Sequence, residues 1–172
     1  MRKGLKLAFY FNDARCTGCY ACVVACKDWH DIPPGPVFFR RVVITEKGHY
    51  PRVSVRFVST ACHHCDKPLC IAACPAGAIS KRAEDGIVVV DKELCLGREA
   101  CGGACQKACP HDAPQFGTEP NPRMQKCDLC YDRWAEGKRP ICVEACPMRA
   151  LDAGDQDTLE SLDGRVKERG QS

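Results

Sequence analysis

Two stretches of the chain carry the hydrophobic pattern of β-strands. Residues 37–44 are rich in phenylalanine, valine and isoleucine, and a turn is expected at Lys47-Gly48. Residues 50–59 then alternate, so that Val53 and Val55 share one face while arginine and serine occupy the other. A period of two predicts a strand that buries one face. We therefore expect a β-hairpin here, with its valine face packed against the rest of the protein.

A second, shorter hairpin is predicted near the middle of the chain. Residues 78–81 lead to a turn sequence at 84–86 (EDG), which is followed by the apolar run 87–90. An Asp-Gly turn beside a β-branched run is a strong hairpin signal. Asp91 comes directly after the run and is expected to cap the segment that follows.

The end of the chain shows a helical pattern. Asp157 and Glu160 have the spacing of a capping box, and Leu159, Leu162 and Val166 form an apolar stripe. We expect a C-terminal helix that packs on the protein. No apolar run approaches the roughly 18 residues needed to span a bilayer, so no membrane-spanning segment is expected.

Length and charge narrow the class of function. A chain of 172 residues suits one compact domain or two small ones. Its formal net charge of +3 is too small an excess to indicate nucleic-acid binding. The apolar run 5–11 contains Lys6 and stops at Asn12, so an export signal is not expected there. Nothing resembles a nucleophile with its base or a phosphate-binding loop, so we expect no catalytic residues.

The strongest chemical signal is the arrangement of the 16 cysteines. They fall into four sets of four: Cys16, Cys19, Cys22, Cys26; Cys62, Cys65, Cys70, Cys74; Cys95, Cys101, Cys105, Cys109; and Cys127, Cys130, Cys142, Cys146. Four thiolates are what one cubane iron–sulfur cluster needs as ligands. The sequence therefore predicts four [4Fe-4S] clusters with all sixteen cysteines as iron ligands.

The spacing within the sets supports this interpretation. The first set has the C-x2-C-x2-C-x3-C run of bacterial ferredoxins, although Lys27 replaces the usual proline. The other three sets end in Cys-Pro, with prolines at Pro75, Pro110 and Pro147. A proline after the last cysteine fixes the direction in which the chain leaves the cluster.

Disulfides and zinc are the two other roles that so many cysteines suggest. The chain is long for a disulfide-stapled domain, which is usually short and secreted. Zinc is bound by four thiolates in two separated C-x2-C pairs. The fourth set alone fits that layout, whereas the first set does not.

The order of the sets predicts an α+β fold made of two ferredoxin-like halves. Residues 56–118 look like a complete two-cluster ferredoxin and form the inner half. Residues 1–55 and 119–172 carry the first and fourth sets and form the outer half. We expect the halves to be related by pseudo-twofold symmetry, each binding two [4Fe-4S] clusters, with an added β-hairpin and a C-terminal helix.

In two-cluster ferredoxins the last cysteine of each run ligates the other cluster. Applied to this chain, the rule predicts four crossed ligand sets: Cys62, Cys65, Cys70 with Cys109; Cys95, Cys101, Cys105 with Cys74; Cys16, Cys19, Cys22 with Cys146; and Cys127, Cys130, Cys142 with Cys26.

The third set departs from the pattern, because its spacing is C-x5-C-x3-C-x3-C-P. Aligned at Cys95, it has Arg98 at the second ligand position. Aligned at Cys105 and Cys109, it has about four extra residues upstream, and we prefer this register. The Gly-Gly pair at 102–103 then lets the longer loop bend Cys101 back to the metal. The alternative is that one cysteine is spare and this cluster is [3Fe-4S].

The sequence resembles the four-cluster ferredoxin subunits of the dimethyl sulfoxide reductase and polysulfide reductase family of molybdopterin oxidoreductases. The resemblance covers roughly residues 10–152 and is clearest at 15–22 (RCTGCYAC), 74–79 (CPAGAI) and 126–133 (KCDLCYDR). It implies an electron-transfer subunit of anaerobic respiration. It also implies a catalytic partner with molybdenum or tungsten on a bis-pterin cofactor, and a possible quinone-reactive membrane subunit.

The alternative to such a subunit is a free-standing soluble polyferredoxin. Free thiols are hazardous in an oxidising compartment, so the clusters should be loaded in the cytoplasm. The chain is then soluble or attached to the membrane through its partners, and co-export with a signal-bearing partner is compatible with this.

Several other residues near the motifs are candidates for supporting roles. His63 and His64 are expected to donate hydrogen bonds near a cluster rather than to bind iron. Trp29 and Trp134 are expected to pack in the protein. A basic neighbourhood surrounds the fourth set, where a solvated face, an offset of cluster charge and contact with an acidic partner are all compatible: Lys126, Arg133, Lys138 and Arg139.

Overall fold

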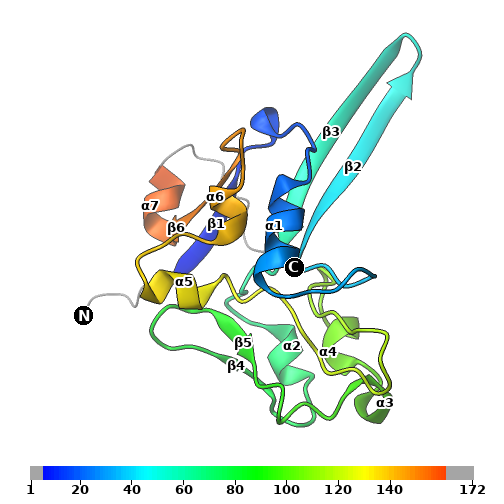
Figure 1. Cartoon of the computed structure of the whole chain (residues 1–172), viewed down its shortest axis with the longest axis vertical. Coiled ribbons are helices and arrows are strands. Elements are labelled where there is room, and N and C mark those ends of the chain that lie inside the picture. Colours follow the sequence, from blue (N-terminus) through cyan, green and yellow to red (C-terminus); the bar gives the residue numbers. More distant parts are fainter. Residues whose placement is uncertain (1–5, 162–172) are drawn as a thin grey trace.

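The computed structural model describes residues 6–161, which form short helices and three two-stranded sheets, one of them a long ribbon that extends away from the helices (Figure 1). The elements in chain order are β1 (Leu7–Phe11), η1 (Asp13–Arg15), α1 (Ala21–Trp29), β2 (Arg40–His49), β3 (Arg52–Ala61), α2 (Leu69–Ala72), β4 (Ile79–Lys81), β5 (Val88–Val90), α3 (Arg98–Cys101), α4 (Ala104–Lys107), α5 (Tyr131–Ala135), α6 (Ile141–Glu144), β6 (Leu151–Asp155) and α7 (Gln156–Ser161).

Strands from opposite ends of the chain pair with each other. β1 lies antiparallel to β6 over its whole length, with Phe9 opposite Ala153. Helices α1 and α6 lie together beside this sheet (Figure 1). Val23, Val143 and Leu151 form the buried core between the sheet and these two helices. The first and last parts of the described chain therefore fold as one unit.

The predicted first hairpin is present, but its turn lies elsewhere. β2 and β3 pair antiparallel with His49 opposite Arg52, so the turn is Tyr50-Pro51. The prediction of a turn at Lys47-Gly48 is wrong. Proline has a fixed φ and no amide hydrogen, so it favours the turn over the ladder. Gly48 is instead the last strand position but one, where a Cβ atom would meet the carbonyl oxygen of Arg52.

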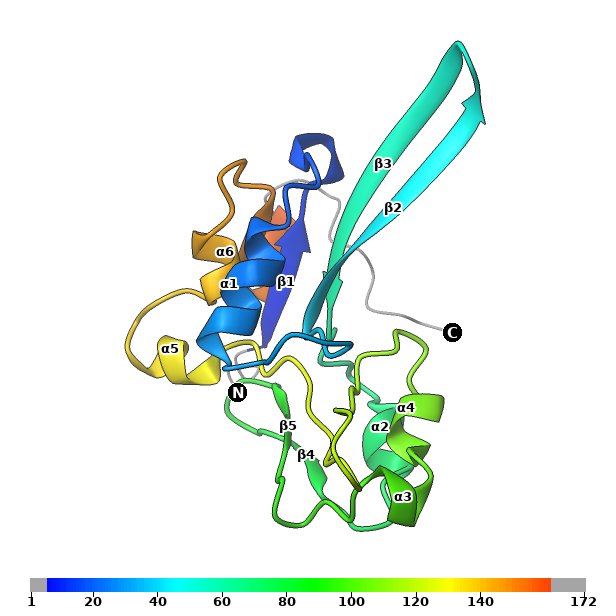
Figure 2. The same ribbon diagram turned by 45° about the vertical axis from the view of Figure 1, so that its right-hand side comes forward.

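The expectation that the valine face of this hairpin is buried is wrong for its outer part. Val53 is 52 % exposed and Val55 is 50 % exposed. The two strands project away from the helices as a long ribbon (Figures 1 and 2). Only the base of the same face packs on the protein, where the ring of Phe57 covers Gly18. The predicted alternation is correct, but the two strands extend beyond the part of the protein on which their valine face could pack.

The predicted central hairpin is confirmed. β4 pairs antiparallel with β5, with Ile79 opposite Val90. Ile79 and Val88 face inward onto Phe116 and Met124. Asp91 caps a turn rather than a helix, because its side-chain oxygen accepts hydrogen bonds from the amides of the second and third residues after it.

A tightly packed seam joins the central hairpin to the terminal strands. Leu7 of β1, Ile87 before β5 and Leu129 form one buried cluster, and Ile87 and Leu129 have no exposed surface. The amide of Leu7 also donates to the carbonyl oxygen of Asp85 at 3.0 Å. Full burial of such side chains stabilises the seam by about 1.5–3 kcal/mol each.

The predicted C-terminal helix begins as α7. Leu159 is 3 % exposed and faces the end of β6, as expected for packing. The helix begins at Gln156, so Asp157 lies in its first turn and not at a cap before it. Leu162 and Val166 lie outside the described residues. Within residues 6–161, none of the helices has the length and apolar character that crossing a bilayer requires.

The contact between Gly18 and Phe57 generates a stability prediction. A Cβ atom on Gly18 would overlap the Phe57 ring, and the residue has φ +68°. We expect Gly18→Ala to destabilise the protein by about 1–3 kcal/mol, from steric overlap and backbone strain together. The thermal midpoint of unfolding, followed by circular dichroism, measures the effect.

Gly77→Ala is the matched control for this prediction. Gly77 has a similar φ of +62°, but nothing lies within 4 Å of the added Cβ atom. This variant carries only the backbone strain, so it should lower the midpoint less than Gly18→Ala. Equal losses in the two variants would show that the Phe57 contact has no cost.

Candidate iron–sulfur centres

The sixteen cysteines gather into four groups in the folded chain. We number them by the cysteine set that supplies most of each group: group I is Cys16, Cys19, Cys22 and Cys146; group II is Cys62, Cys65, Cys70 and Cys109; group III is Cys74, Cys95, Cys101 and Cys105; group IV is Cys26, Cys127, Cys130 and Cys142. Groups I, II and III each line one hollow, and those of groups I and III enclose about 330 Å³ including their open mouths. Each group thus combines three cysteines of one set with one of another.

All four sets have a residue of positive φ shortly after their first cysteine. It is the second residue after that cysteine in every set: Gly18 (φ +68°), His64 (+48°), Gly97 (+85°) and Leu129 (+60°). A left-handed residue reverses the chain sharply. The first, second and fourth sets contain a C-x2-C pair. In each of them this turn brings the second cysteine of the pair back to the group that contains the first.

The three Cys-Pro sites share a second turn. The third residue after the cysteine is left-handed at Gly77, Asp112 and Arg149. The next residue is an alanine each time, and the amides of Ala113 and Ala150 donate to the sulfurs of Cys109 and Cys146 at 3.4 and 3.3 Å. Amide donors to sulfur stabilise a thiolate ligand.

The first set ends differently because Lys27 follows its last cysteine. Lysine has an amide hydrogen and no ring, so helix α1 continues through Cys26 to Trp29. Cys26 therefore lies inside a helix, 4 % exposed, and points to group IV. The missing proline is thus explained by the helix that occupies its place.

The third set keeps the positive φ after its first cysteine, although its loop is longer. Gly97 has this φ with an extended ψ of 162°, and Arg98 stands at the position that a second cysteine takes in the other sets. The extra residues form the short helix α3, and Gly102 and Gly103 are both left-handed, at φ +63° and +66°. Cys101 lines the same hollow as the other three cysteines of group III. The two glycines make this return of the chain possible.

The groups lie next to one another in a definite order. Cys22 of group I packs in one cluster with Cys142 of group IV. Cys127 of group IV packs with Cys62 of group II. Cys70 of group II packs against Cys105 of group III. The groups therefore follow the order I, IV, II, III through the protein.

Burial raises the pKa of several cysteine thiols in these groups. Burial raises the pKa of Cys70 to about 11, and the charge of Cys62 adds to this. Burial likewise raises the pKa of Cys105 to about 11, with Cys101 adding to it. Burial raises the pKa of Cys127 far above its ordinary value. Crowded thiolates are unfavourable without a cation, so metal binding must displace protons here.

Arg40 is a site residue that the sequence analysis missed. It opens β2, is 2 % exposed and donates from Nη1 to Ser59 Oγ at 3.1 Å. Burial lowers the pKa of Arg40, and the negative charges of the surrounding sulfurs, led by Cys142, more than reverse this effect. The only signal in the sequence was an arginine inside a stretch of apolar residues.

The predicted basic neighbourhood divides into buried and exposed members. Lys126 is 4 % exposed, and its ammonium donates to the carbonyl oxygens of Val88 and of Cys127, the latter at 2.8 Å. Arg133 is 5 % exposed, pairs with Glu144 and donates to the carbonyl oxygen of Arg139 at 2.7 Å. A solvated face is therefore the wrong description for Lys126 and Arg133, although Lys138 is exposed.

The histidines of the second set have structural contacts. His64 is 1 % exposed, and its Nδ1 accepts a hydrogen bond from the amide of Val88 at 3.0 Å. The His63 ring stacks on His111 with 3.9 Å between centroids. His64 thus accepts at Nδ1 and links the second set to β5.

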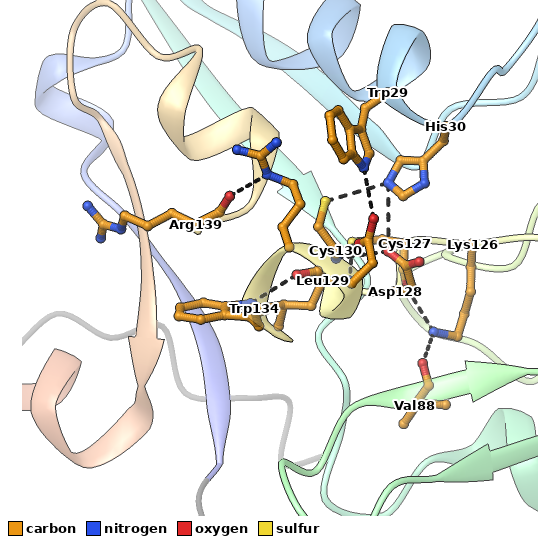
Figure 3. Close-up of polar contacts among 12 residues, drawn as sticks. Trp29, His30, Val88, Lys126, Cys127, Asp128, Leu129, Cys130, Trp134 and Arg139 are labelled. Carbon is orange, nitrogen blue, oxygen red and sulfur yellow. Dashed lines mark hydrogen bonds and ion pairs between the residues drawn. The ribbon is translucent and has the colours of Figure 1, made fainter. Parts of the chain in front are cut away.

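The two tryptophans differ in exposure. Trp134 packs in the seam and donates to the carbonyl oxygen of Leu129 at 3.1 Å, as expected for packing. Trp29 is 41 % exposed and donates to Asp132 at 3.3 Å, and the Arg133 guanidinium lies 4.5 Å from its ring centre. Both side chains surround the turn that carries Cys130 (Figure 3).

The donor sets fit cubane clusters better than the two alternatives. None of the sixteen cysteines forms a disulfide in the structure. A tetrahedral zinc site would bring four sulfurs within ~4 Å of one another. Among the described residues, ligand atoms as close as 4.8 Å occur in sets of three only at His30, Asp128 and Cys130. A cubane cluster holds its four thiolates farther apart than a single ion does. This wider spacing is the one that the sulfurs of the four groups require.

Comparison with known proteins supports this conclusion. A family model for the 4Fe-4S dicluster domain matches residues 53–156, and a second model with the same description matches residues 15–79. The chain belongs to the 4Fe-4S dicluster family. The chain is therefore a 4Fe-4S protein, and the predicted family resemblance is confirmed.

Curated relatives resemble the chain over most of its length. It is 46 % identical to the B subunit of the anaerobic dimethyl sulfoxide reductase of Escherichia coli, over 91 % of this protein and 77 % of the relative. It is 40 % identical to the thiosulfate reductase electron transfer subunit PhsB of Salmonella typhi, over 87 % and 76 %. It is 38 % identical to the formate dehydrogenase iron-sulfur subunit of Wolinella succinogenes, over 99 % and 92 %. Like these relatives, the chain is an electron-transfer subunit and not a catalytic one.

The contacts of Lys126 generate a second stability prediction. Lys126→Met would leave the buried carbonyl oxygens of Val88 and Cys127 without their donor, which costs about 1–3 kcal/mol per group. We expect a lower thermal midpoint for loss of the visible absorption of the loaded protein. Lys138→Met is the control, because Lys138 is an exposed partner of Glu136 and its loss should change stability by less than about 0.5 kcal/mol. Equal midpoints in the two variants would contradict the role given to Lys126.

Proposed function

We propose that this chain carries single electrons through four [4Fe-4S] clusters, one in each cysteine group. The observation that carries the proposal is the continuous order I, IV, II, III, in which each group packs against the next. When bound, a cubane cluster accepts and releases one electron at a time. The protein holds neighbouring clusters close together and buries the path between them. We propose that the chain divides into an inner half, 56–118, with groups II and III, and an outer half with groups I and IV.

Both ends of the row carry exposed apolar side chains beside a cysteine group. Tyr20 and Met148 line the hollow of group I and are 42 % and 45 % exposed. Leu96 lines the hollow of group III and is 51 % exposed. Exposed apolar surface at the terminal groups suits docking of redox partners there. Electrons would then enter at one end and leave at the other.

The partner at one end is a catalytic subunit with molybdenum or tungsten on a bis-pterin cofactor. This partner is supported by relatives that are subunits of dimethyl sulfoxide reductase, thiosulfate reductase and formate dehydrogenase. We propose a quinone-reactive membrane subunit, or another redox protein, for the other end. The clusters are loaded in the cytoplasm, and the chain reaches the membrane through these partners.

Metal analysis and electron paramagnetic resonance test the cluster count. Anaerobically purified protein should contain about sixteen irons, four for each proposed cluster, and give coupled signals only after reduction. About fifteen irons, with a signal already present in the oxidised protein, would show a [3Fe-4S] centre. Zinc without iron would overturn the proposal. Purification without a stoichiometric partner would favour the free-standing polyferredoxin.

The crossed ligand sets are tested by two serine variants. Cys109 lines the hollow of group II although it belongs to the third set, and Cys105 lies in group III. We expect Cys109→Ser to alter the signal of the group II cluster and Cys105→Ser that of the group III cluster. Spectra of the reduced variants compare the two. The same cluster lost in both variants would mean that the third set ligates one cluster without crossing.

A further inference from the structure

Arg40 is a buried positive charge without a carboxylate partner in the described part of the chain. It is 2 % exposed, and a guanidinium stays protonated in proteins. Within residues 6–161 its one hydrogen-bond acceptor is Ser59, and its Nε and Nη2 atoms reach no acceptor. The cation also lies 4.3 Å from the centre of the Phe9 ring. Burying an uncompensated charge is costly, so an anion is expected beside Arg40.

Arg133 provides a comparison within the same protein. It is equally well buried, at 5 % exposure. Its guanidinium pairs with Glu144 and donates to the carbonyl oxygen of Arg139. Among the described residues, one of these two buried arginines therefore has a carboxylate partner and the other has none. The difference points to a negative charge at Arg40 that the polypeptide does not itself provide.

The surroundings of Arg40 show where that negative charge lies. The sulfurs that interact with it come from two cysteine groups: Cys22 from group I, and Cys26, Cys127 and Cys142 from group IV. Ser59, which accepts from Nη1, also lies 3.5 Å from the Cys22 sulfur. Arg40 thus sits at the junction between groups I and IV, where the base of the hairpin enters the protein.

We propose that Arg40 is the shared counter-ion of the two clusters held by groups I and IV, and that it raises the reduction potentials of both. The proposal rests on the proposed function, because it assigns a role toward the clusters. A cluster becomes more negative on reduction, so a nearby fixed positive charge favours its reduced form. The low dielectric of a buried site strengthens this attraction. The Nε and Nη2 nitrogens are available to donate to the clusters and their thiolates.

Arg40→Met removes the charge while keeping a long side chain, and redox titration of the loaded full-length protein measures its effect. We expect two of the four midpoint potentials to fall by about 59 mV. For a one-electron couple this corresponds to a tenfold weaker affinity for the electron. The other two midpoints should not move. Arg40→Lys keeps the charge with fewer donors, so it should lower the same two midpoints less.

Arg52→Met is the matched control. Arg52 belongs to the same hairpin and carries the same charge, but it lies exposed at the far end of the ribbon. All four midpoints should match those of the unaltered protein in this variant. If Arg40→Met does not retain iron, Arg40→Gln is measured instead. Loss of iron in both neutral variants but not in Arg40→Lys would support the counter-ion role.

Three results separate failure of this inference from failure of the proposed function. Sixteen irons with unchanged midpoints in the neutral Arg40 variants would overturn the counter-ion role and leave the electron path intact. An equal fall in all four midpoints would also overturn it, because the effect would not be local. Absence of iron from the unaltered protein would overturn the proposed function itself.

Discussion

The molecule is organised by the need to complete each cysteine group from a distant part of the chain. Group I lies between α1 and α6 only because β1 pairs with β6. Group IV draws Cys26 from the first quarter of the chain to a turn near residue 130. The secondary structure itself is slight, with several helices of four residues and strands of three. Sulfur-lined centres therefore take the place that a continuous apolar core has in other domains.

The sequence predicted the chemistry well because cysteine spacing is a local property with few interpretations. The four sets, the central hairpin and the alternation along β3 all follow from residues close together in the chain. Burial was harder, because it depends on how far the body of the protein extends. Val53 and Val55 alternate correctly yet stand clear of that body. The turn at Tyr50-Pro51 was missed because the Lys-Gly pair nearby offered an equally local signal.

Charge placement was the least predictable part of the site. Lys126 was named as part of a basic neighbourhood, but its burial follows from the carbonyl oxygens of two separate segments. Arg40 carried no motif at all, and only its position at the base of the hairpin brings it beside two cysteine groups. Motif spacing identifies metal ligands, whereas the cations that surround them come from whatever segment passes nearby.

The crossing of cysteines between distant segments also sets an order of assembly during synthesis. Groups II and III need only residues 62–109, so their sulfurs can meet while the ribosome is still making the last third of the protein. Group I waits for Cys146 and group IV for Cys142, close to the end of the described chain. Domains form as their residues emerge. The middle of this protein can therefore close before its first cysteine set has found its partner.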